Sequence, residues 1–78
     1  MPNHRPLHQI AREIRLDWKN VNFAAEPYLV AMESMNSINE NYGYDTGKSV
    51  VLYFLSNAAS WRGDVAKRIK NELKAMAK

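Results

Sequence analysis

The longest apolar run in the chain reads VVLYFL and spans residues 50–55, and its conformation decides the fold. β-Branched and aromatic residues favour strands, so a buried strand is the competing interpretation of this run. No second strand-like segment exists in the sequence with which such a strand could pair. We therefore predict a helix over residues 46–58. Because it is apolar on almost all sides, we expect it to be central and to contact several neighbours.

The sequence on either side predicts three further helices, over residues 6–19, 27–40 and 61–76. Each carries apolar side chains at steps of three and four, which places them on one helical face. These expected core stripes are Leu7, Ile10, Ala11, Ile14 and Trp18; Tyr28, Ala31, Met32, Met35 and Ile38; and Trp61, Val65, Ile69, Leu73 and Met76.

Residues between these stripes suggest where the helices begin and end. Gly43 suits a left-handed stop after the second helix. Asp45 and Ser60 are suitable N-caps for the third and fourth helices. Gly63 weakens the start of the fourth helix by about 1 kcal/mol relative to Ala, and close packing is one reason for a glycine there.

Together these signals predict an all-α fold, a compact four-helix bundle-like domain without a sheet. The 78 residues allow one domain, spanning residues 1–78. The absence of cysteine removes disulfides and thiolate metal sites and fits a reducing cytoplasm. The N-terminus lacks the apolar segment of a signal peptide, and a six-residue apolar run is far shorter than the roughly 20 residues that span a bilayer. We expect a cytoplasmic protein without membrane contact.

Charge is distributed unevenly along the chain. Residues 1–19 carry +2, residues 20–45 carry −4 and residues 46–78 carry +5, for a net charge of +3. The C-terminal excess suggests an anionic partner. The alternative is that the basic and acidic helices simply neighbour each other, either within the chain or across a dimer. Both a monomer and a homodimer stay open.

No motif predicts catalysis, a cofactor or a metal. Residues 43–49, GYDTGKS, look like a phosphate-binding loop, but one residue is missing between the glycines and no strand precedes them. His4 and His8 have the spacing of two zinc ligands on a helix, but no third ligand accompanies them. No nucleophile has a nearby base. We expect a protein that is not an enzyme.

Two binding surfaces are the remaining candidates. Tyr42 and Tyr44 bracket a glycine turn, and exposed tyrosines on loops are favoured recognition anchors, so our first hypothesis is a protein-interaction module that binds another protein. The alternative is a small DNA-binding protein that uses the basic faces of the fourth and first helices. Its candidate contact residues are Arg12, Arg15, Arg62, Lys67, Lys70 and Lys74.

Residues 42–74, YGYDTGKSVVLYFLSNAASWRGDVAKRIKNELK, resemble small helical proteins of actinobacterial phages and their hosts, as do residues 11–32, AREIRLDWKNVNFAAEPYLVAM. The resemblance covers about residues 10–74. It implies no established activity and no binding residues. The resemblance implies a phage accessory protein that acts on host machinery or on DNA. If the first hypothesis also holds, the partner is a protein of the host.

Overall fold

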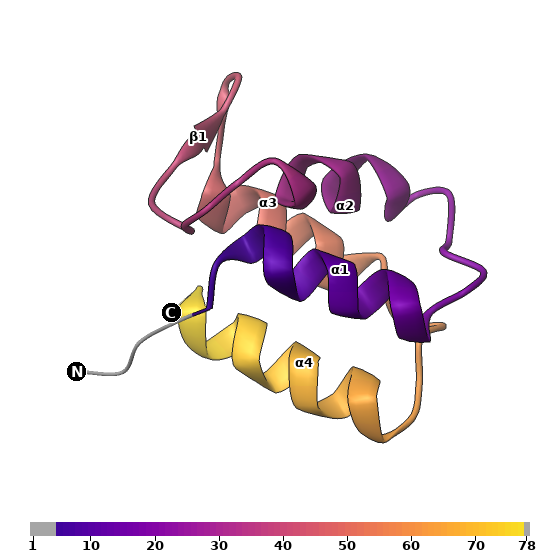
Figure 1. Ribbon diagram of the computed structural model, residues 1–78. Coiled ribbons are helices and arrows are strands. Elements are labelled where there is room, and N and C mark those ends of the chain that lie inside the picture. Colours follow the sequence, from indigo (N-terminus) through magenta and orange to yellow (C-terminus); the bar gives the residue numbers. More distant parts are fainter. Residues whose placement is uncertain (1–4, 78) are drawn as a thin grey trace.

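Four helices and a small hairpin form the molecule in the computed structural model, which describes residues 5–77 (Figure 1). In chain order they are α1 (Leu7–Asp17), α2 (Glu26–Glu33), β1 (Asn41–Tyr42), β2 (Asp45–Thr46), α3 (Gly47–Ser56) and α4 (Asp64–Met76). α1 and α3 each pack against both α2 and α4, within an envelope of 28 × 27 × 18 Å. The prediction of a compact, mostly helical fold is thus confirmed.

The prediction of a fold without a sheet is wrong at one place. β1 and β2 pair antiparallel, with Asn41 opposite Thr46 and Tyr42 opposite Asp45. The two strands project from the helical body as a hairpin (Figure 1). The helix predicted for the VVLYFL run is confirmed, because α3 contains this run. The two strands lie just before α3 in the sequence.

α2 ends seven residues before its predicted end at residue 40. The segment after Glu33 is polar, and its side chains compete for the backbone groups that a helix would use. The Asn36 backbone N–H donates to the Glu40 carboxylate, and the Asn39 N–H donates to the Ser37 hydroxyl. The chain therefore turns toward the hairpin instead of continuing the helix.

α4 begins three residues later than predicted, so Ser60 is not its N-cap. Gly63 occupies that position with φ of +114°, a conformation that side chains rarely adopt. A Cβ at Gly63 would meet nothing within 4 Å, so backbone conformation and not close packing explains this glycine.

The core gathers apolar side chains from all four helices around three aromatic rings. Trp18 and Trp61 stack with centroids 5.7 Å apart, and Phe54 meets both rings edge-on. The predicted stripes supply most of this core, including Ile10, Ile14, Ile69 and Leu73 at 0% exposure. Leu29, which the predicted stripe omitted, is equally buried.

Candidate interaction surfaces

The most exposed aromatic side chain of residues 5–77 lies at the tip of the hairpin. Gly43 and Tyr44 form its two-residue turn, and Gly43 has φ of +64°. Glycine at the first central position, followed by a residue with negative φ, fits a type II′ hairpin turn. The prediction that Gly43 ends the second helix is therefore wrong, because α2 ends at Glu33 and Gly43 uses its positive φ in a hairpin turn. Tyr44 is 108% exposed and Tyr42 is 45% exposed.

The base of the hairpin is closed where the chain after α2 meets the start of α3. The Gly47 N–H donates to the Glu40 carbonyl at 2.7 Å, and a Cβ at Gly47 would lie 2.4 Å from the Ile38 carbonyl oxygen. Thr46, not Asp45 as predicted, caps α3, because its Oγ1 accepts from the Ser49 N–H at 3.0 Å. The resemblance of residues 43–49 to a phosphate-binding loop thus reflects a hairpin turn, a close backbone contact and a helix cap.

α3 leads away from the hairpin and carries exposed apolar side chains. Leu52 and Tyr53 are 44% and 49% exposed, and the Tyr53 ring lies 5.4 Å from that of Tyr28 on α2. At 1.5 Å per residue, Tyr53 is about 9 Å along the helix axis from Gly47. Leu55, which the sequence places in a helix apolar on nearly all sides, is only partly buried.

Two further apolar side chains are exposed near the connection between α1 and α2. Phe23 is 88% exposed and Leu16 is 66% exposed. Leu16 falls off the apolar stripe of α1, so helical periodicity was able to identify it as an outward-facing leucine. Phe23 precedes α2 in a connection without periodicity, and no sequence signal distinguishes it from a core phenylalanine.

The acidic face of α2 pairs within the chain. The Arg15 guanidinium donates to Glu33 at 2.8 Å and also contacts Glu26. The hydrogen bonds to Glu33 and then to Glu26 raise the Arg15 pKa above its ordinary value. Arg15 therefore acts as a bridge between α1 and α2, and its charge is balanced by both carboxylates.

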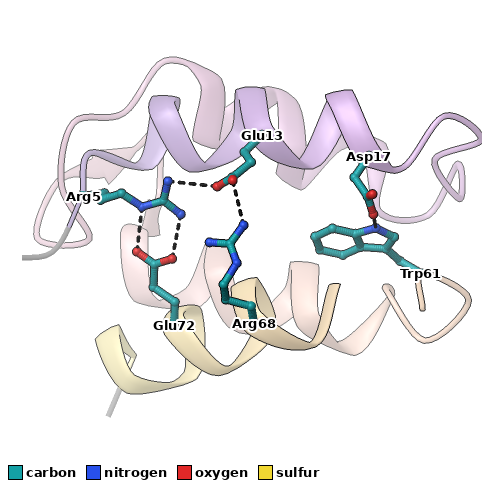
Figure 2. A network of polar contacts seen from close by, with 6 residues as sticks. All are labelled: Arg5, Glu13, Asp17, Trp61, Arg68 and Glu72. Carbon is teal, nitrogen blue, oxygen red and sulfur yellow. Dashed lines mark hydrogen bonds and ion pairs between the residues drawn. The ribbon is translucent and has the colours of Figure 1, made fainter. Parts of the chain in front are cut away.

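A second polar network joins α1 to α4 (Figure 2). Arg5 holds Glu72 through two hydrogen bonds of 2.7 and 2.9 Å, and Glu13 lies between Arg5 and Arg68. Arg68 first and Arg5 second lower the pKa of Glu13. At the other end of α1, Asp17 accepts from the Trp61 indole N–H at 2.8 Å. We call Arg5, Glu13, Arg68 and Glu72 the ionic clasp.

The opposite side of α4 borders an open groove of about 450 Å³, which we call the α4 groove. Its lining includes Trp61, Arg62, Asp64, Lys67, Lys70 and Lys74. The Lys70 ammonium donates to the carbonyls of Ala58 and Trp61, at 2.7 and 2.6 Å. Burial, and then the positive charges of Lys74 and Arg62, lower the Lys70 pKa. Lys70 is thus half-buried and supports the connection from α3, whereas Lys67 and Lys74 are exposed.

The six predicted nucleic-acid contacts do not share one surface. Four of them line the α4 groove, whereas Arg12 and Arg15 border a smaller hollow of about 320 Å³ with His8, Leu16 and Glu33. α1 turns Arg15 toward α2 and Glu13 toward α4. It turns Asp17 toward Trp61, which precedes α4. Acidic side chains therefore lie between the basic faces of α1 and α4.

Within residues 5–77, no group of three or more His, Asp or Glu side chains could hold a metal ion. His4 lies outside these residues. None of the helices in the described part of the chain is long and apolar enough to cross a membrane. Comparisons with protein-family models, with curated proteins and with solved structures found no match to this chain.

Proposed function

We propose that this protein is a non-enzymatic interaction module that binds another protein through its hairpin tip. The observation that carries this proposal is the full exposure of Tyr44 on a two-residue turn, in a hairpin whose base is closed by the contact of Gly47 with the Ile38 backbone. A tyrosine offers a large contact area at low cost in conformational entropy, and a fixed hairpin lowers that cost further. Tyr42 on β1 adds a second, half-exposed ring.

The apolar side chains of α3 support the same assignment. Leu52 and Tyr53 expose apolar surface along the helix that the hairpin leads into. Protein interfaces place such side chains at their centre, with polar groups around them. The resemblance to actinobacterial phage proteins extends the proposal: the chain is then a phage accessory protein, and its partner is a protein of the host.

The test is retention of one partner by variants of the immobilised protein. Lysate of an actinobacterial host, with and without nuclease treatment, is passed over wild type, Tyr44→Ala and Phe23→Ala, and a protein captured from the treated lysate is then purified and titrated. Phe23→Ala is the matched control, because it removes a comparably exposed aromatic ring away from the hairpin. We expect Tyr44→Ala to weaken binding by at least about 1 kcal/mol and Phe23→Ala to leave it unchanged.

The opposite pattern, in which Phe23→Ala weakens binding and Tyr44→Ala does not, would assign the interface to the connection between α1 and α2. Loss of all retained species on nuclease treatment would exclude a protein partner. Circular dichroism of both variants verifies that the fold is unchanged.

A further inference from the structure

The α4 groove concentrates positive charge that the rest of the molecule does not balance. Arg62, Lys67 and Lys74 are exposed, and within residues 5–77 none of them forms an ion pair. Lys70 adds a fourth positive charge at the groove but bonds only neutral carbonyls. The lowered Lys70 pKa is consistent with the closeness of Lys74 and Arg62.

Three other arginines of the chain are balanced within the fold. Arg5, Arg15 and Arg68 each contact one or two carboxylates at 3.1 Å or less. These contacts engage Glu13, Glu26, Glu33 and Glu72, and of the residues that line the groove only Asp64 is acidic. Four cations without a carboxylate partner in residues 5–77 therefore lie together on one side of α4, where an anionic partner would gain most from them.

The chemistry of the groove fits a nucleic-acid backbone better than a protein surface. The large exposed hydrophobic side chains of residues 5–77 are Leu16, Phe23, Val30, Tyr42, Tyr44, Leu52 and Tyr53, and none of them lines the groove. A protein interface needs apolar anchors at its centre, whereas phosphate contacts need only charge and hydrogen-bond donors.

The spacing of the cations points the same way. Lys67 and Lys74 are seven residues apart on α4, which separates them by about 10 Å along the axis. One isolated phosphate does not reach both, but a polyanion with successive phosphates does. We propose that the α4 groove binds the phosphate backbone of a nucleic acid through Arg62, Lys67 and Lys74, independently of the hairpin.

The test measures binding to a fluorescein-labelled DNA duplex and to a single-stranded RNA of equal length by fluorescence anisotropy, across a salt series. For three contacts on the duplex, the slope of log K against log salt should be near −2.7, so affinity falls about 40-fold between about 50 and 200 mM salt. Lys67→Gln/Lys74→Gln leaves Arg62 as the one exposed cation that lines the groove. It should reduce the slope to near −0.9, so that affinity falls only about 3.5-fold over the same salt range. Tighter binding of either polymer identifies which nucleic acid the groove prefers.

Lys19→Gln/Lys48→Gln is the matched control, because it removes two exposed cations outside the groove. It should change affinity by less than about twofold. Equal losses in both double variants would mean attraction to net charge alone and would overturn the proposal. So would the absence of binding at the lowest salt, or equally tight binding of a polyglutamate peptide, which would identify an acidic protein segment as the partner. Tyr44→Ala should leave nucleic-acid binding unchanged, which separates this site from the proposed protein-binding hairpin.

Discussion

Gly47 begins α3 with its backbone pressed against the chain that follows α2. A Cβ at this position would lie 2.4 Å from the Ile38 carbonyl oxygen and 2.7 Å from the carbonyl carbon. Both are backbone atoms, so no side-chain rotation relieves the contact. The sequence motif that suggests phosphate binding thus contains a glycine required for packing, and this contact holds the hairpin in place.

Gly47→Ala tests this role. Alanine is favoured over glycine in helices by up to about 1 kcal/mol, but overpacking against fixed atoms costs about 1–3 kcal/mol. We expect the clash to prevail, with a lower free energy of unfolding in urea denaturation and shifted amide resonances in residues 38–47. A variant more stable than wild type would show that helix propensity outweighs the contact.

At the level of elements, the ionic clasp fixes α1 against α4 (Figure 2). Glu13 is central to it, because its two oxygens face two different arginines, Arg5 at 2.9 Å and Arg68 at 2.8 Å. The hydrogen bonds from Arg68 and then Arg5, and to a lesser extent the charges of both, lower the pKa of Glu13 from the ordinary value of 4.5. A carboxylate with a lowered pKa stabilises the fold above its unfolded-state pKa, and this contribution is lost as the pH falls through the folded-state value.

We therefore expect Glu13→Gln to lower the free energy of unfolding by about 1 kcal/mol at pH 7, where the carboxylate is charged. As the pH falls below 4.5, Glu13 becomes protonated, and the difference in the free energy of unfolding between wild type and variant should shrink. Urea denaturation across this pH range measures it. A difference for Glu13→Gln that does not change with pH would contradict the assigned role.

At the level of the whole molecule, stability depends on a thin core whose edge lies along α3. Ile69 is 0% exposed, whereas Leu55 is only packed against the outside of the core. A domain of this size has a small free energy of unfolding, so one deep cavity threatens the fold. Depth of burial, and not apolar character alone, decides which side chains are essential.

Ile69→Ala should therefore cost about 2–5 kcal/mol, as expected for a buried aliphatic side chain. Leu55→Ala should cost clearly less, because its site opens to solvent and creates little cavity. Chemical denaturation of both variants gives the comparison. Equal destabilisation would mean that Leu55 is buried more deeply than its position at the edge of the core implies.

Local sequence patterns are enough to predict that four helices form and which side chains supply most of the core. Apolar residues at steps of three and four predict Ile10, Ile14, Ile69 and Leu73 as core, because periodicity is a property of neighbouring residues. The lack of a partner strand correctly indicated a helix for residues 50–55. Tyr44 was also identified as a candidate, since a residue beside a glycine turn has few buried neighbours.

The hairpin and the partners of the charged side chains depend on contacts between residues that are distant in the sequence. Strands of two residues carry no periodic signal, and their pairing depends on the turn at Gly43 and the contact of Gly47 with Ile38. The bonds that balance Arg15 and Arg5 join residues 18 and 67 positions apart. A pattern of neighbouring residues carries no information about partners so far apart in the sequence. The packing of the helices therefore determines which cations are paired with carboxylates and which face the α4 groove.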